Sequence, residues 1–138
     1  MNDHLNPPHG GELTELLVDE AAALQIKQQS REWSSWDLRP RQLCDLELLL
    51  NGSFSPLGGF MGRRDYEAVC SSMRLADGTL WPIPIVLDLP PGMADDVINS
   101  AVLLLDGDDR ILAGNLGYNA KSGIVALLLV NDGQGFAQ

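Results

Sequence analysis

Two serines, Ser53 and Ser55, carry hydroxyl groups that a base could activate as nucleophiles. A serine becomes nucleophilic when a neighbouring base removes its proton and a third group orients that base. The only histidines, His4 and His9, lie at the N-terminus, away from the serines in sequence. The sequence therefore predicts no nucleophilic triad, and we expect no catalytic residue in this chain.

Two groups of acidic side chains resemble, in part, an acid–base pair and a metal site. Asp45 and Glu47 are two residues apart on an expected helix, so their carboxylates point in different directions and suit acid–base catalysis poorly. The run Asp106–Asp109 is acidic around a glycine but lacks the later glutamate of a calcium-binding loop. A polar hairpin turn is the better interpretation of this run.

Metal and cofactor signals are equally weak. Cys44 and Cys70 lie among apolar residues on expected helices, whereas a zinc site needs four ligands at short paired spacing. We expect both to be buried, reduced thiols. The glycines near the centre of the chain form neither a phosphate-binding loop nor a dinucleotide fingerprint. The sequence predicts no metal site and no cofactor site.

The composition indicates a single folded domain. The chain has 138 residues, of which 45% are hydrophobic and 20% charged, enough for a packed core. No apolar run approaches the roughly 20 residues of a membrane span. The N-terminus has neither the basic start nor the apolar stretch of a secretory signal. We therefore expect a cytoplasmic protein that has no membrane partner.

The net charge of -10 argues against nucleic acid as a partner, because an acidic surface repels phosphate backbones. The basic pairs Arg39 with Arg41 and Arg63 with Arg64 are short and are followed by acidic residues. Solvated helix starts explain them better than nucleic-acid contacts. Nucleic acid is thus an unlikely partner.

The element that organises the chain runs from Gln42 to Met61. A helix beginning at Pro40 is expected to stop at Gly52, and an apolar loop with a proline and two glycines follows. A loop this apolar must be buried, either in the domain's own core or against another domain, and the residues alone leave both alternatives open. The candidate docking loop consists of Ser55, Pro56, Leu57, Gly59, Phe60 and Met61.

The remaining elements change from helical to strand patterns along the chain. Helices are expected over Glu12–Leu17, Asp19–Gln29 and Arg64–Met73. Strands are expected in a hairpin over Leu75–Trp81, over Pro82–Leu89, in a hairpin over Val102–Ala113 and over Ile124–Val130. Hairpins produce antiparallel pairs, so this order predicts an α+β fold or a small barrel with packed helices.

Several motifs in one order resemble the N-terminal domain of ATP sulfurylase (sulfate adenylyltransferase). The resemblance covers about Leu5 to Leu116. It is carried by Pro8–Gly11, Arg41–Glu47, Asn51–Met61, Tyr66–Val69, Met73–Ile85 and Asp106–Ala113. It implies a PUA-like small β-barrel of mostly antiparallel strands with packed N-terminal helices.

The resemblance also implies a role without catalysis. The family's enzyme joins sulfate to ATP, which gives adenosine 5′-phosphosulfate and pyrophosphate. Its catalytic residues lie in a following nucleotidyltransferase domain, within a Gln-x-Arg-Asn-Pro-x-His-x-x-His segment that this sequence does not contain. The chain is then an accessory domain whose partner is a sulfurylase catalytic domain or a second copy of itself. The alternative is a stand-alone RNA-binding module, because PUA-type domains often bind RNA.

The sequence departs from the family in two places. Ser53 stands where the family commonly has glycine, and the segment 117–138 does not resemble the family's continuation. Gly117–Gly123 is expected to be a loop, and Ile124–Val130 a strand that closes on the domain itself. We therefore expect residues 1–138 to form one domain, either stand-alone or remodelled.

Overall fold

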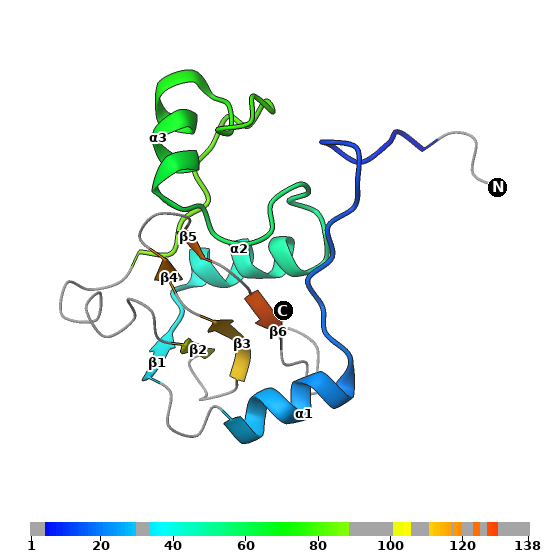
Figure 1. Ribbon diagram of the computed structural model, residues 1–138, viewed down its shortest axis with the longest axis vertical. Coiled ribbons are helices and arrows are strands. Elements are labelled where there is room, and N and C mark those ends of the chain that lie inside the picture. Colours follow the sequence, from blue (N-terminus) through cyan, green and yellow to red (C-terminus); the bar gives the residue numbers. More distant parts are fainter. Residues whose placement is uncertain are drawn as a thin grey trace.

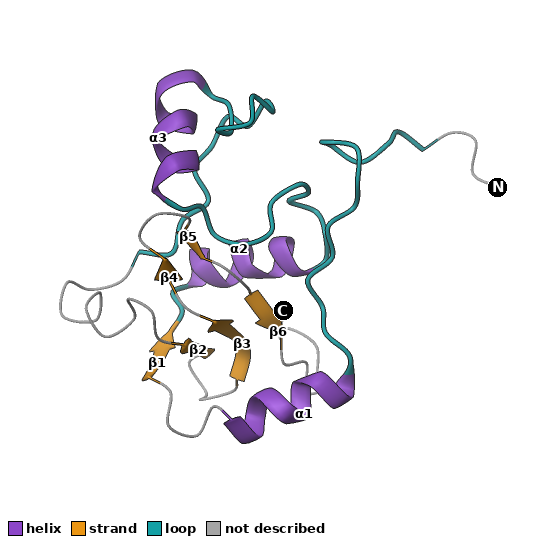
Figure 2. Cartoon of the chain, in the orientation of Figure 1, coloured by secondary structure: helices purple, strands orange, loops and turns teal. Residues whose placement is uncertain are grey.

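A computed structural model describes residues 5–29 and 34–88, together with the strands at 101–105, 111–116, 118–119, 123–124 and 127–129. Both helices and strands are present (Figures 1 and 2). The helices are α1 (Glu20–Gln29), α2 (Pro40–Leu50) and α3 (Arg63–Ser72). The strands are β1 (Ser34–Asp37), β2 (Ala101–Leu105), β3 (Ile111–Leu116), β4 (Tyr118–Asn119), β5 (Gly123–Ile124) and β6 (Leu127–Leu129).

Four strands form one sheet in the order β1-β2-β3-β6, and β4 pairs with β5 in a second, two-stranded sheet. β1 runs parallel to β2, whereas β2 with β3, β3 with β6, and β4 with β5 are antiparallel. A parallel pair needs a long crossover, and here the crossover contains α2 and α3. Figure 1 shows the four-stranded sheet between α1 below and α2 above.

The predicted hairpin near the C-terminal end is present as β2 and β3, with Ala101 opposite Leu116 and Leu104 opposite Ala113. Its expected turn at 106–109 lies outside the described residues. Instead of one strand over Ile124–Val130, the structure has the two short strands β5 and β6. β6 pairs with β3 and extends the main sheet.

The helix predicted over Asp19–Gln29 is confirmed as α1, which runs from Glu20 to Gln29. The Asp19 carboxylate accepts a hydrogen bond from the amide of Ala22 (2.8 Å) and caps α1. The helix predicted over Glu12–Leu17 is wrong. The segment is not helical, and the amide of Leu16 donates to the carbonyl oxygen of Leu50 at the end of α2 (3.1 Å).

Helix α2 begins and ends as predicted. Pro40 occupies the first turn, where its missing N–H costs nothing. The side chain of Gln42 caps the N-terminus of α2, because its oxygen accepts a hydrogen bond from the amide of Arg39 (2.9 Å). Its side-chain nitrogen donates to the backbone and side-chain oxygens of Asp88 (3.1 and 2.9 Å). Gly52 follows the helix at φ +83°, a conformation that favours glycine.

The stretch after α3 was predicted to form a hairpin and then a further strand, and the structure has a turn closed by one antiparallel bridge. Over Leu75–Trp81 only a single bridge, Arg74 to Leu80, is present, and the amide of Leu75 donates to the carbonyl oxygen of Thr79 (2.8 Å). The described part of Pro82–Leu89, residues 82–88, is not a strand either. Its prolines cannot donate to a ladder, which is the physical reason.

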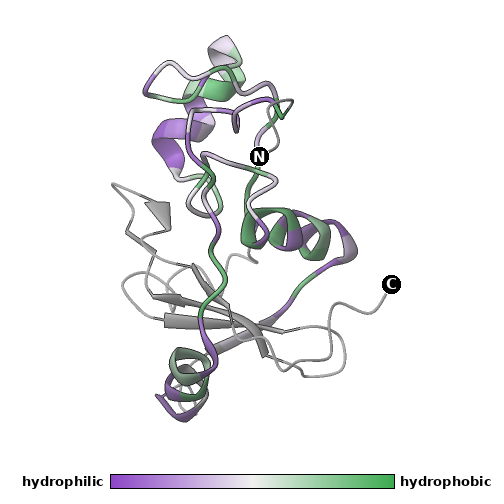
Figure 3. Ribbon diagram, turned by 90° about the vertical axis from the view of Figure 1, so that its right-hand side faces the viewer, coloured by the Kyte–Doolittle hydropathy of each residue, from purple (hydrophilic) through white to green (hydrophobic). Residues whose placement is uncertain are grey.

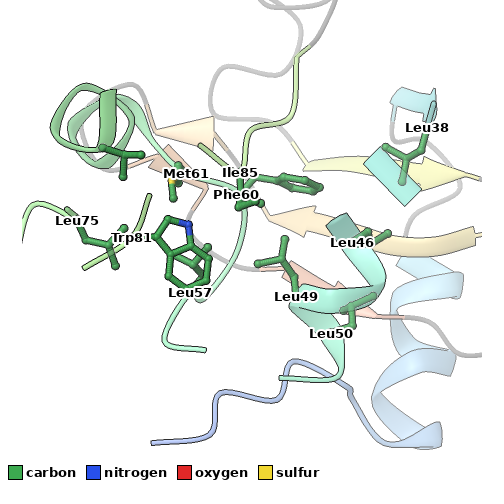
Figure 4. Close-up of a cluster of buried hydrophobic side chains, with 11 residues drawn as sticks. Leu38, Leu46, Leu49, Leu50, Leu57, Phe60, Met61, Leu75, Trp81 and Ile85 are labelled. Atoms are coloured by element: carbon green, nitrogen blue, oxygen red, sulfur yellow. The ribbon is translucent and has the colours of Figure 1, made fainter. Parts of the chain in front are cut away.

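The core lies between α2, the loop after it, α3 and the segment 75–85 (Figure 4). Its buried residues are Leu38, Leu46, Leu49, Leu50, Leu57, Phe60, Met61, Val69, Leu75, Trp81 and Ile85. Figure 3 shows hydrophobic and hydrophilic sides on α2, as expected for a helix with one buried face.

The prediction that the two cysteines are buried is wrong, because Cys44 and Cys70 are both exposed. Each lies one or two residues from the buried positions Leu46 and Val69, so the turn of the helix rotates it to the outer face. Among the described helices, none combines the length and the apolar character that a membrane crossing requires.

Candidate functional site

The candidate docking loop, Ser55–Met61, is anchored at both ends by hydrogen bonds. The Ser55 hydroxyl donates to the carbonyl oxygen of Gly52 (2.6 Å) and accepts from the amide of Thr14 (2.8 Å). The peptide bond between Ser55 and Pro56 is cis. At the far end, the amide of Met61 donates to the carbonyl oxygen of Ile85 (2.7 Å). Its backbone is therefore fixed by segments distant in sequence.

The large apolar side chains of the loop point into the domain. Leu57, Phe60 and Met61 are only 6%, 3% and 8% exposed. Figure 4 shows Leu57 and Met61 beside Trp81, and Phe60 on the side toward α2. Of the two alternatives for the loop, these side chains take the first and fill the domain's own core.

The parts of the loop that reach the surface are the ring of Pro56 and the backbone at Gly58. Pro56 is half-buried, Gly58 is exposed, and Ser55 and Gly59 are buried. A methyl group added at Gly58 would meet no atom within 4 Å, so its outer side is open. A docking role for the loop stays a prediction, and it involves this outer rim.

The N-terminal segment lies against the loop. This contact gives a structural role to the Pro8–Gly11 motif. A Cβ atom at Gly10 would be 2.8 Å from Cγ of Pro56, so only glycine permits this approach. Nε2 of His9 donates to the carbonyl oxygen of Leu80 (2.7 Å), and its ring centroid is 6.0 Å from that of Trp81. The sequence alone did not predict the contact of Gly10 with Pro56 or that of His9 with Leu80.

Beside the loop is a half-open hollow of about 460 Å³. It is lined by Pro56, Leu57, Gly58, Gly62, Arg64, Asp65, Leu75, Ala76 and Asp77.

Its polar walls are held in place by backbone hydrogen bonds. The carboxylate of Asp65 accepts from the amide of Ala76 (2.9 Å), which ties α3 to the turn. Hydrogen bonds from Thr79 lower the pKa of Asp77, which favours the charged form of this carboxylate. Such a mixed wall suits a polar contact with another molecule.

The residues considered for chemistry do not converge. Ser53 is exposed, and the hydroxyl of Ser55 is committed to the backbone. Burial raises the pKa of Asp45, and the Arg41 guanidinium nearby, with Nε 3.9 Å from the carboxylate, opposes the shift. Glu47 is exposed on another face. In the part of the chain that the structure describes, no group of three or more histidine, cysteine or acidic side chains is placed to hold a metal ion.

Comparisons with known proteins point to one kind of domain. Residues 6–119 match the family model described as PUA-like domain. The chain is 47% identical to the sulfate adenylyltransferase of Saccharomyces cerevisiae over 107 residues, which are 75% of this chain and 21% of that protein. It is 47% identical to the sulfate adenylyltransferase of Aspergillus clavatus over 113 residues, 78% of this chain and 20% of that protein. The chain thus spans about a fifth of the length of the curated relatives that it matches.

Among solved structures, the chain is similar to the hexameric APS kinase from Thiobacillus denitrificans. The TM-score is 0.76 at 30% sequence identity, and the superposition covers 96% of this chain and 28% of that one. This likeness spans nearly all of this chain and a minor part of a longer one.

Proposed function

The chain belongs to the PUA-like domain family, and on that premise we propose that it is a non-catalytic accessory domain of the sulfate adenylyltransferase type. The observation that carries the proposal is the 47% identity over three quarters of this chain, against only a fifth of each relative. The reaction itself, ATP and sulfate to adenosine 5′-phosphosulfate and pyrophosphate, then takes place on a separate nucleotidyltransferase domain. This chain supports that domain by packing against it.

The proposed docking element is the loop Ser55–Met61 with the hollow beside it. Burial of Phe60 and Met61 gives the loop a firm base, while Pro56 and Gly58 stay at the rim. The hollow has the volume of a small ligand pocket and is large enough to receive side chains of a partner. A loop fixed at both ends loses little conformational entropy on binding, which favours this use.

We further propose that residues 1–138 form one small β-barrel of mostly antiparallel strands, with the helices packed on it. The antiparallel pairs β2–β3 and β3–β6 support this arrangement, as does the return of β6 to the main sheet. The solved relative is described as hexameric, so self-association is the competing mode of assembly. Light scattering of the purified chain distinguishes a monomer from an oligomer.

A domain exchange tests the proposed function. This chain replaces the matching region of the Saccharomyces cerevisiae sulfate adenylyltransferase, and pyrophosphate release from ATP and sulfate is measured. We expect turnover by the chimera and none by this chain alone. An enzyme that lacks the region altogether is the matched control. A chimera that folds but does not turn over contradicts the proposal, and so does turnover by the chain alone.

A further inference from the structure

Residues 12–18 form a drawn-out segment whose exposure alternates. Figure 1 shows the chain leading from the loop region to α1 without a helical turn. Thr14, Leu16 and Val18 are half-buried. Leu13 and Leu17, next to them in sequence, are 59% and 49% exposed. A period of two is the pattern of an extended strand with one face on the protein.

The backbone amides of residues 13–17 alternate in the same way. The amides of Thr14 and Leu16 donate inward, to the Ser55 hydroxyl (2.8 Å) and the Leu50 carbonyl (3.1 Å). Among the described residues, the amides of Leu13 and Leu17 have no hydrogen-bond acceptor, and neither does that of Glu15. Unpaired amides along an extended segment are a template for another strand.

The side chains around this edge combine apolar and acidic character. The side chains of Leu13 and Glu15 both contact Gly52, since a Cβ atom at Gly52 would be 2.9 Å from Cδ1 of Leu13 and 3.3 Å from Cγ of Glu15. Glu15 lies between the two exposed leucines, with Glu12 and Asp19 on either side. Like charges directly opposite one another across a strand pair are destabilising, so a partner strand that is basic here is favoured.

We propose that the outer edge of residues 12–18 is a docking surface that pairs with an extended segment of the nucleotidyltransferase domain. That segment carries apolar side chains toward Leu13 and Leu17 and a lysine or arginine toward Glu15. Main-chain hydrogen bonds give the affinity, and the alternating side chains give the specificity. The identity of the partner rests on the proposed function; the edge itself rests on the contacts of this chain.

Hydrogen exchange of the full chain, compared with the chimera described above, tests the proposal. We expect exchange over residues 12–18 to be about tenfold slower or more in the chimera, because the edge amides gain partners. Leu17→Glu should return exchange toward that of the isolated chain, and Glu15→Lys should do so most clearly at low salt. Leu24→Glu is the matched control, since Leu24 is 57% exposed on α1 and gains the same charge. Urea unfolding of each isolated variant checks that it folds.

The outcomes separate the two proposals. If the chimera releases pyrophosphate but its amide hydrogen exchange at residues 12–18 is not slower, the docking role of this edge is wrong. The proposed function is then unaffected. An equal effect of Leu17→Glu and Leu24→Glu also overturns the edge. A folded chimera without turnover overturns the proposed function, and the partner named here with it.

Discussion

The hydroxyl of Ser55 accepts a hydrogen bond from the amide of Thr14 at 2.8 Å, which joins the N-terminal segment to a loop 41 residues later. Ser55 is 4% exposed, so its removal leaves a shielded amide without a partner. We predict that Ser55→Ala lowers the free energy of unfolding by about 1–3 kcal/mol in urea titrations. Ser53→Ala is the control, because Ser53 is exposed, and should change it by about 0.5 kcal/mol or less. Equal effects of the two substitutions contradict the prediction.

The burial of Phe60 predicts that its truncation lowers the free energy of unfolding more than Ser55→Ala does. Its side chain is 3% exposed inside the core cluster, so Phe60→Ala should lower the free energy of unfolding by about 3–5 kcal/mol. Gly58→Ala in the same loop adds a methyl group that meets no atom within 4 Å and should be nearly neutral. Chemical denaturation followed by tryptophan fluorescence measures both. If Phe60→Ala unfolds at the wild-type midpoint, the loop does not fill the domain's own core.

The lowered pKa of Asp77 predicts part of the stability that the domain loses in acid. Hydrogen bonds from Thr79 lower its pKa in the folded state below the usual value of 3.8. A depressed pKa contributes stability above the pKa of the unfolded state, and this stability is lost as pH falls through the lower folded value. Between about pH 5 and pH 2, Asp77→Asn should therefore lose less stability than the wild type. Thermal melts across this pH range measure the difference. A steeper loss of stability in Asp77→Asn than in the wild type would contradict the prediction.

The net charge of -10 predicts weak RNA binding, which bears on the alternative of an RNA-binding module. Phosphate repulsion opposes association, and whatever binding remains should fall as salt rises. Gel shifts with single-stranded and hairpin RNA at physiological salt should show no tight complex. A complex that persists at submicromolar protein would favour the alternative.

Local signals in the sequence predicted each of the three helices that the structure describes. Asp19 caps α1, and Pro40 and Gly52 bound α2, because a helix start or stop depends on a few neighbouring residues. The hairpin of β2 and β3 was predicted for the same reason. The family resemblance is confirmed by the PUA-like match over residues 6–119 and by the sulfate adenylyltransferase relatives.

The errors arise where distant segments decide the conformation. The leucines of Glu12–Leu17 have helical spacing, yet Leu16 bonds to Leu50, and the segment runs extended beside the end of α2. Whether the loop is buried depends on Trp81 and α3, which no local pattern relates to Phe60. The motif around Gln42 does not predict that its side chain joins α2 to Asp88 through two hydrogen bonds.

Docking on a nucleotidyltransferase domain is the central claim, and a calorimetric titration tests it most directly. This chain is titrated into the Saccharomyces cerevisiae sulfate adenylyltransferase lacking its matching region, after circular dichroism shows that the shortened enzyme is folded. We predict a complex of one chain per catalytic domain with a dissociation constant on the order of ten micromolar or below. No binding to the folded enzyme at several times that concentration would contradict the account.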